Sequence, residues 1–360
     1  MSRVRKRVRK TASGIDARFG TARFLSHVMT KLFPNHWSFF LGELALYSFV
    51  ILVLTGILLT FFFQPSMTDM IYHGSYIRLD GVHMSEAYAS TLRISFDVRG
   101  GLLMRQIHHW AALLFVAAIS VHLMRIFFTG AFRRPREVNW LIGTVMFALA
   151  AAEGFAGYSL PDDLLSGTGV RIAEGIMMSI PVVGTYVVYF IFGGHYPGHD
   201  FIPRLYVIHV LLIPGLLAAL ITAHLLTIWH QEHTEWPGKG KSEDTASGEP
   251  MYPIFITKTT ALFFFTAGIT AVLATFVQIN PIWLYGPYSP ANVSSNSQPD
   301  WYIGFLEGGL RLMPNWQTNA WGHTVIWNVF VPAVLLPVLF FLLLALYPFF
   351  EEYVTGDLRH

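Results

Sequence analysis

An apolar stretch with a histidine near each end constrains this 360-residue chain more than any other feature. Residues 102–128 supply the roughly 20 apolar residues that a helix needs to cross a hydrocarbon core about 30 Å thick. His108 and His122 lie 14 residues apart within this stretch. On an ideal helix they are therefore about 21 Å apart in height and only about 40° apart around the axis. One face of the helix carries an imidazole near each membrane surface.

A second apolar segment, residues 204–229, repeats this design. It contains His209 and His224, which lie 15 residues apart, and on an ideal helix the second is rotated by about 60° in the opposite sense. Pro214 lies between them. Because a proline removes one helical hydrogen bond, it permits a kink or a π-bulge that can absorb the extra residue.

Arginines and glycines recur at matching positions. Ionisable groups inside a membrane are energetically costly, so their presence indicates a function. A helix bundle around two stacked haems would explain them. Each haem would take one histidine from each of the two segments, and the arginines would bind its propionates. Glycines on two further apolar segments would let a flat macrocycle approach the backbone. The residues concerned are Arg105, Arg125 and Arg204, and the pairs Gly42–Gly56 and Gly143–Gly157, each pair 14 residues apart.

Simpler explanations exist for each residue alone. A single membrane histidine is more often a hydrogen-bonded packing residue than a ligand, and glycine is common in transmembrane helices because it allows close packing. The recurrence of histidines, arginines and glycines at matching heights favours the bundle that encloses two haems.

Composition agrees with a membrane protein. The chain is 53% hydrophobic and 13% charged, which is too apolar for a soluble domain. It contains no cysteine, which excludes disulfides, iron–sulfur ligation by this chain and thioether attachment of a haem. We therefore expect non-covalent haem b, an environment of membrane lipids and no nucleic-acid partner.

Six apolar spans are predicted, together with short interfacial helices in the region 161–203, so that the fold class is an all-α transmembrane bundle. Four parts follow: a basic, solvated N-terminal tail (1–36), a haem-binding four-helix domain (37–230), a flexible polar linker (231–253) and a C-terminal part with two spans (254–360). The predicted spans are 37–63, 102–128, 138–160, 204–229, 254–277 and 321–350.

The distribution of basic residues sets the orientation. Of the 24 lysines and arginines, 17 lie in the tail, the second and fourth connections and the C-terminus, and 7 lie on the other side. The positive-inside rule then places both termini in the cytoplasm. His108 and His209 fall on the outer side of the cell membrane, whereas His122 and His224 fall on the inner side. We therefore expect each pair to consist of the two histidines at the same depth.

The loop QPDWYIGFLEGG adds a specific motif. Together with the histidine segments, its Pro299, Asp300, Trp301 and Tyr302 resemble the P-[ED]-W-Y motif of cytochrome b in quinol:cytochrome c oxidoreductases. The segments GYSLP (157–161) and SIPVVG (179–184) also resemble sequences that line the outer quinol site of that family. The resemblance extends over roughly 37–350.

The resemblance implies an enzyme subunit. His108 with His209 would hold a low-potential haem, and His122 with His224 a high-potential haem. Quinol oxidised at the outer site would send one electron to a Rieske iron–sulfur protein and one through the haems to an inner quinone, with proton translocation. Asp300 would accept a quinol proton. The other expected outer-site residues are Pro299, Trp301, Tyr302, Tyr158, Pro161 and Gly169.

Departures from the family pattern refine the expectation. Asp300 in place of glutamate resembles the actinobacterial type, which implies menaquinol and a membrane-bound dihaem cytochrome c subunit. A homodimer is expected, and a terminal cytochrome oxidase in a supercomplex is a further candidate partner. The family's Trp-Gly is Asp162–Asp163 here. At the inner site the usual histidine is Trp229, so His230 and Lys258 are the candidates.

The chain ends soon after its sixth span, whereas mitochondrial relatives have eight. Either it is truncated after residue 360 or the remaining helices lie elsewhere.

Two other classes of protein remain open. One is a dihaem b membrane anchor of another quinone-linked dehydrogenase or a hydrogenase, which shares the two-histidine helices but lacks a PDWY loop. The other is a transporter or an assembly subunit, in which the histidines would relay protons or pack. Haem spectra and co-purifying subunits discriminate among them.

Overall fold

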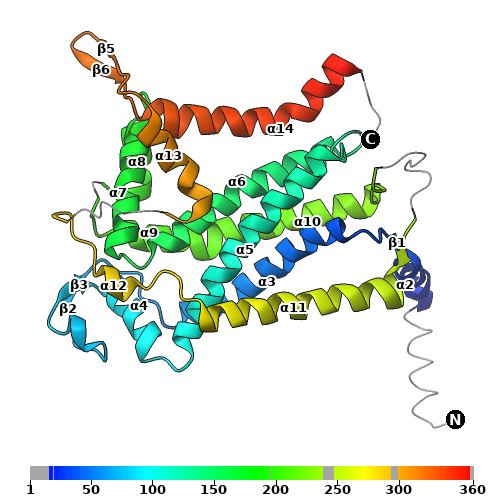
Figure 1. Cartoon of the computed structure of the whole chain (residues 1–360), viewed down its shortest axis with the longest axis horizontal. Helices are drawn as coiled ribbons and strands as arrows, with labels where there is room; N and C mark the ends of the chain where they lie inside the picture. Colours follow the sequence, from blue (N-terminus) through cyan, green and yellow to red (C-terminus); the bar gives the residue numbers. More distant parts are fainter. Residues whose placement is uncertain (1–15, 19, 195, 238–246, 293–298, 357–360) are drawn as a thin grey trace.

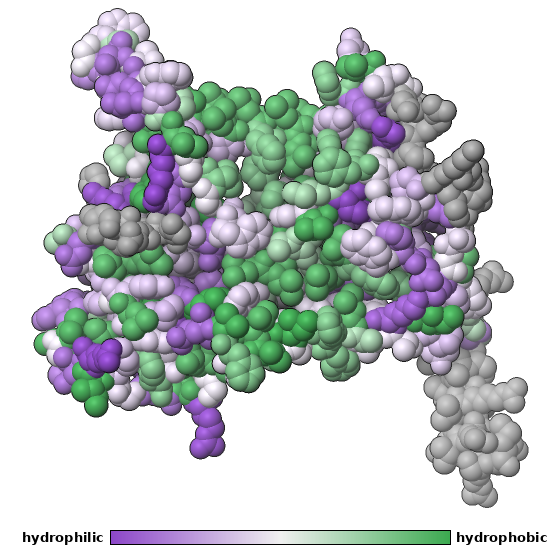
Figure 2. Space-filling view, in the orientation of Figure 1, coloured by the Kyte–Doolittle hydropathy of each residue, from purple (hydrophilic) through white to green (hydrophobic). Residues whose placement is uncertain are grey.

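Six long apolar helices form the body of the molecule in a computed structural model of the chain. The structure describes residues 16–18, 20–194, 196–237, 247–292 and 299–356. Within these residues, six helical segments are long and apolar enough to cross a membrane, as predicted. Figure 2 shows an apolar band between two more polar ends. The six segments are Trp37–Thr60, Gly101–Phe128, Glu137–Ser159, Phe201–Gln231, Met251–Phe276 and Val331–Thr355.

Local sequence explains where these helices begin and end. Gly100 and Gly130, both with positive φ, flank α5, and glycine is the residue that adopts this conformation without steric cost. Glu137 opens α6, where a negative charge interacts favourably with the helix N-terminus. The long helices are α3 (Phe40–Thr60), α5 (Gly101–Phe128), α6 (Glu137–Ser159), α9 to α10 (Phe201–Val207 and Ile213–Gln231), α11 (Ile256–Phe276) and α14 (Leu336–Thr355).

Shorter elements gather at one end of the bundle, on the left in Figure 1. This end corresponds to the predicted outer side, and α7 and α8 lie between the third and fourth spans, where one or two short interfacial helices were expected. The elements are β2 (Asp69–Ile71), β3 (His83–Ser85), α4 (Glu86–Phe96), α7 (Leu164–Met178), α8 (Gly184–Phe192), α12 (Ile282–Tyr285), α13 (Gly304–Leu312), β5 (Thr318–Ala320) and β6 (His323–Ile326).

The predicted start of the sixth span was wrong. That span begins at Val331 rather than Trp321, because the preceding residues form the antiparallel hairpin β5–β6. Trp321 and Gly322 both have positive φ, as the tight turn between two strands requires. Polar side chains before and after this turn do not suit the hydrocarbon core.

The N-terminal tail is not wholly a solvated chain. Its basic run falls in residues 1–15, outside the described residues. After it come α2 (Thr21–Thr30) and β1 (Leu32–Phe33), and β1 pairs with β4 (Glu249–Pro250) of the linker. The middle of the linker, 238–246, also lies outside the described residues. Its ends are packed, since Trp236 stacks on His36 with ring centroids 4.0 Å apart.

The bundle core lies between the two histidine levels. Phe115, Val116 and Ala118 of α5 are buried against residues of α3, α6 and α10, and Tyr302 joins them from the loop before α13. These residues lie between positions 108 and 122 of α5. A layer of packed side chains therefore lies between the outer and inner histidines.

Candidate functional site

The structure brings together the two pairs of histidines that height alone predicts. The ring centroids of His108 and His209 lie 6.2 Å apart with the ring planes at 79°. Those of His122 and His224 lie 6.4 Å apart at 80°. Imidazole nitrogens coordinate metals at about 2 Å, and the centroid lies about 1 Å behind the nitrogen, so rings on opposite faces of one metal ion have centroids about 6 Å apart. Both pairs match this spacing.

A π-helical turn accounts for the 15-residue spacing on the second helix. Between α9 and α10 the residues Ile208–Leu212 form this turn, which contains His209. A π-bulge adds one residue to a helical turn, so it compensates for the difference between 15 and 14. The expected irregularity is thus present, just before Pro214 rather than at it.

The Nδ1 atoms of the outer pair have polar neighbours. Nδ1 of His108 lies 2.9 Å from Oγ1 of Thr55. Nδ1 of His209 lies 2.9 Å from Oε1 of Glu153, although the two groups are not aligned as a hydrogen bond. A ring held through Nδ1 leaves Nε2 for a metal, which is the usual arrangement of metal-binding histidines.

Three of the four predicted glycines lie against these imidazoles. A Cβ atom added to Gly42 would lie 3.1 Å from Cε1 of His122, and one added to Gly56 would lie 3.3 Å from Cε1 of His108. A Cβ on Gly157 would collide with the His209 ring. Around Gly143 a Cβ would meet nothing within 4 Å. The structure therefore gives contacts with the histidines for three positions and open space at the fourth.

The three predicted arginines differ in their surroundings. The buried Nε and one terminal nitrogen of Arg125 make no hydrogen bond in the described part of the chain, and its guanidinium lies 4.0 Å from the Phe39 ring centroid. Arg105 donates to the carbonyl of Asn280 at 2.9 Å, and its Nε is unpartnered among these residues. Both are suited to an anionic group such as a propionate, since a buried donor without a partner is costly.

The guanidinium group of Arg204 already has hydrogen-bond partners elsewhere in the structure. Its guanidinium donates to the carbonyls of Tyr189 and Phe190 at the end of α8, at 3.0 and 2.7 Å, and to Asp200 at 3.2 Å. A cation that binds the last carbonyls of a helix is stabilised by the helix dipole. The geometry thus supports a role for Arg204 in holding α8, and it does not bring Arg204 to the histidines.

A cavity of about 280 Å³ connects the outer histidines to the PDWY loop. Asp300 and Tyr302, predicted from the motif, line it, as do Tyr158 and Pro161. The Tyr302 hydroxyl donates to Oδ2 of Asp300 at 3.2 Å. Burial, followed by the neighbouring carboxylate, raises the pKa of Tyr302, so Tyr302 acts as a neutral donor.

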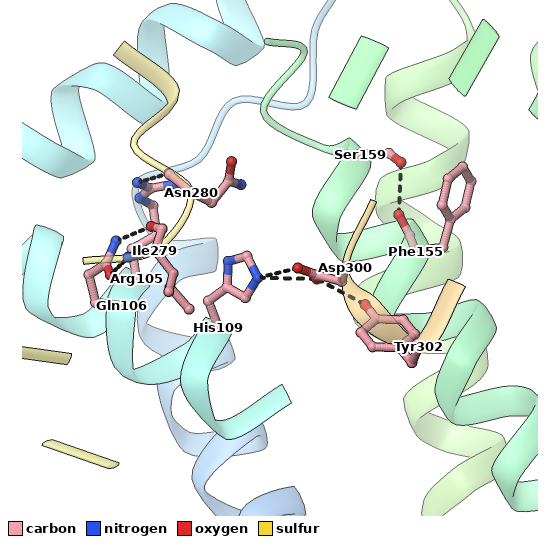
Figure 3. Close-up of polar contacts among 9 residues, drawn as sticks. All are labelled: Arg105, Gln106, His109, Phe155, Ser159, Ile279, Asn280, Asp300 and Tyr302. Atoms are coloured by element: carbon pink, nitrogen blue, oxygen red, sulfur yellow. Dashed lines mark hydrogen bonds and ion pairs between the residues drawn. The ribbon is translucent and has the colours of Figure 1, made fainter. Parts of the chain in front are cut away.

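His109 is the functional residue that sequence reasoning missed. Its Nε2 lies 3.2 and 3.1 Å from the two carboxyl oxygens of Asp300. Figure 3 shows the Asp300 carboxyl group between His109 and Tyr302. Adjacent helical residues point about 100° apart, so His109 cannot face the same partner as His108. The histidine doublet in the sequence was the available signal.

The remaining outer residues are less enclosed. Trp301 is about half exposed, and Pro299 is partly buried; neither residue is among those that line the cavity. A Cβ added to Gly169 would meet nothing within 4 Å, so this position leaves open space. The proposed inner residues are not brought together in the described structure, since His230 is exposed and Lys258 pairs with Glu249 at 2.6 Å.

The Asp162–Asp163 pair has a structural task. Asp163 is fully buried and caps α7, with Oδ2 accepting from the backbone N–H groups of Leu165 and Ser166 at 3.1 and 3.2 Å. The Asp162 carbonyl accepts from the N–H of Tyr288 at 3.0 Å. Burial raises the pKa of Asp162 to about 7. These bonds tie the end of α6 and the start of α7 to the loop that leads to the PDWY segment.

Comparisons with known proteins agree with this arrangement. Residues 113–287 match the family model described as cytochrome b (N-terminal)/b6/petB. The chain is 54% identical over 350 residues to the cytochrome bc1 complex cytochrome b subunit of Streptomyces coelicolor, covering 97% of this chain and 64% of that protein. It is 52% identical over 352 residues to the subunit of the same name from Mycobacterium tuberculosis, covering 98% and 64%.

A solved structure shares the fold. A chain of the hyperthermophilic respiratory Complex III superposes with a TM-score of 0.74 at 22% identity, covering 94% of this chain and 82% of that chain. The fold is a helix bundle with six apolar segments long enough to cross a membrane, and two pairs of facing histidines lie at two levels within it. Residues 113–287 match a cytochrome b family model, and nearly the whole chain is similar to the cytochrome b subunits of bc1 complexes. The chain spans 64% of the length of the curated relatives cited here.

Proposed function

We propose that this chain is the dihaem cytochrome b subunit of a proton-translocating quinol:cytochrome c oxidoreductase. The spacing of the facing histidines, 6.2 and 6.4 Å between ring centroids, carries the proposal. His108 and His209 would hold the outer, low-potential haem, and His122 and His224 the inner, high-potential haem. Haem b held by these histidines would supply reversible one-electron transfer, and ligation by two histidines would disfavour oxygen binding.

Asp300 is the proposed proton acceptor for quinol at the outer site. Its carboxyl group lies at the cavity that also reaches the outer histidines, and it is 17% exposed, so it can pass a proton to water. Tyr302 and His109 hold it by hydrogen bonds from two sides. Quinol loses two protons and two electrons as it becomes quinone, and the electrons separate, one to a Rieske protein and one inward.

The inward electron would reduce a quinone near the inner face. His230 and Lys258 are the proposed contacts there, and proton uptake at that face would complete the charging of the membrane. Lys258 lies close to Asn35 and Glu249. A quinone would therefore compete with these partners for the ammonium group.

The proposed complex contains a Rieske iron–sulfur subunit and a membrane-bound dihaem cytochrome c subunit, with the cytochrome b chain as a homodimer among membrane lipids. A terminal cytochrome oxidase is a further proposed partner. The aspartate at position 300 supports menaquinol as the substrate, and the names of the actinobacterial relatives support a bc1-type complex. The distribution of basic residues supports the cell membrane with a cytoplasmic N-terminus.

The alternative is a dihaem b anchor of another quinone-linked dehydrogenase. That function needs both histidine pairs but no proton acceptor at the outer cavity. The contacts of Asp300 with His109 and Tyr302 favour the oxidoreductase, since an anchor leaves this partly buried carboxyl group without a function.

Purification of the membrane-embedded chain in mild detergent tests the proposal. We expect a reduced-minus-oxidised spectrum with two b-type haems of separate midpoint potentials, and co-purification of a Rieske protein. Two b haems with dehydrogenase subunits and no Rieske protein would favour the anchor. The absence of b haem would overturn both functions.

Arg125→Leu is expected to lower the midpoint potential of the inner haem. Removing a positive charge disfavours the more negative, reduced state, and at a separation of about 10 Å the effect is on the order of tenfold in the redox equilibrium, or about 59 mV. Potentiometry of purified protein measures it. Arg204→Leu is the matched control and should leave both midpoints unchanged, because Asp200 and the end of α8 already bind that guanidinium. Equal shifts in both variants would contradict the assignment.

Gly157→Ala is expected to remove most of the outer haem. The new Cβ collides with the His209 ring, and α6 and α10 are too closely packed to separate without cost. Haem content per chain should fall from two towards one, with the inner haem spectrum retained. Gly268→Ala in α11, where a Cβ meets nothing within 4 Å, should keep both haems. Full haem content in the Gly157 variant would mean that His209 binds elsewhere.

A further inference from the structure

Glu153 is a carboxyl group inside a membrane-spanning helix with no place in the function derived so far. It lies on α6, one turn before Gly157, and its side chain is only 17% exposed. An ionisable group at this depth is costly unless it has a partner. Its Oε1 atom lies 2.9 Å from Nδ1 of His209, whereas its buried Oε2 makes no hydrogen bond within the described chain.

The contact is well placed for a hydrogen bond. Glutamate rotates easily about its last torsion, so a small rotation aligns an oxygen lone pair with the N–H of His209. That ring already lies against Gly157 and opposite His108. With Nδ1 engaged by Glu153, the only ring nitrogen left for a metal is Nε2.

The inner pair lacks such a carboxyl group. Nδ1 of His122 is buried and without a partner in the described part of the chain. Nδ1 of His224 is likewise buried and has no hydrogen-bond partner among those residues. No ion pair joins an acidic side chain to either histidine among the described residues. On the outer side, the second ligand His108 has the neutral hydroxyl of Thr55. Glu153 therefore makes the two histidine pairs chemically unequal.

We propose that Glu153 is a positioning residue for His209 and that it lowers the midpoint potential of the outer haem relative to the inner one. A carboxyl group that accepts from Nδ1–H raises the basicity of the imidazole. A more basic ligand stabilises oxidised iron, which carries one more positive charge than reduced iron. This inference rests on the two-haem function proposed above and deepens it.

A lower outer potential has a directional consequence. An electron that moves from the outer to the inner face works against a membrane potential that is negative inside. A potential gap between the haems offsets that work. Glu153 thus supplies part of the driving force for inward transfer through a single contact on one ligand.

Glu153→Gln tests the inference, because it keeps the size and an acceptor oxygen but removes the acidic group. We expect the outer haem to become easier to reduce by about tenfold, or about 59 mV for one electron, with the inner midpoint unchanged. Potentiometry resolves both haems without turnover, and electron paramagnetic resonance of the oxidised outer haem should change with it. Glu43→Gln is the matched control, since Glu43 bonds to Thr259 rather than to a histidine. It should leave the outer midpoint unchanged.

The outcomes separate this inference from the function on which it rests. A wild-type protein without two b haems overturns the two-haem function itself. Two haems with an unchanged outer midpoint in the Gln variant, or equal shifts of both midpoints, overturn the role of Glu153. Should the Gln variant lose the outer haem, Glu153→Asp decides. It retains a carboxyl group at a greater distance, so a smaller upward shift supports the inference and a wild-type midpoint overturns it.

Discussion

Replacement of Asp300 by asparagine is expected to slow quinol-driven reduction of the outer haem and the Rieske centre by roughly 10²–10⁴-fold. Asparagine keeps the shape and the hydrogen bond from Tyr302 but cannot accept a proton. The loss is largest if no substitute base exists, and water in the cavity reduces it. Turnover should partly recover at higher pH, where water and hydroxide accept protons more readily. Both haems should stay bound, because the PDWY loop contributes no iron ligand.

Steady-state quinol:cytochrome c turnover in membranes, normalised to haem content, measures this effect. Asp69→Asn is a matched control, since Asp69 also contacts a histidine, His83, at 2.9 Å on the same side but is 69% exposed and does not line the cavity. It should turn over as the wild type does. If Asp300→Asn had wild-type turnover across the pH range, the proton would leave by another route and Asp300 would be a turn residue.

His122→Leu is expected to abolish binding of the inner haem while the outer haem remains. The two histidine levels of α5 are about 21 Å apart, and the buried layer formed by Phe115, Val116 and Ala118 lies between them. Without His122, only His224 would remain to hold a haem at the inner level. Electron transfer to the inner quinone should then cease.

Haem content per chain and potentiometry of the purified variant test this prediction. His109→Leu removes a different histidine of the same helix and should keep both haems, because His109 faces Asp300 rather than another histidine. Equal loss of both haems from correctly folded His122→Leu would contradict pairing by height.

Much of the bundle could be predicted from the sequence because it depends on distances along one chain. Helix rise and the length of an apolar run determine how many spans there are and at what height each histidine lies. The six spans and the facing pairs, His108 with His209 and His122 with His224, follow from these quantities. Proline and glycine in the apolar segment before the fourth span predicted one or two short helices there, and the structure has two, α7 and α8.

Contacts between helices were harder to predict. Gly143 and Gly157 lie 14 residues apart on one predicted span, yet only Gly157 lies against a histidine ring. Arg105, Arg125 and Arg204 look equivalent in sequence, but Arg204 binds Asp200 and the end of α8. The early part of the predicted sixth span is a hairpin, because turn conformations at Trp321 and Gly322 outweigh the local apolar residues.

The sequence by itself determined the class of fold, the histidine heights and the PDWY segment, since hydropathy and helical periodicity act locally. The tertiary structure alone decided that His109 meets Asp300 and that Glu153 meets His209. Those contacts join residues 191 and 56 positions apart. They depend on how far each helix is rotated about its axis and on the π-helical turn at Ile208–Leu212. Packing between helices determines both the rotation of each helix and the π-helical turn, and neither can be predicted from the pattern within a single segment.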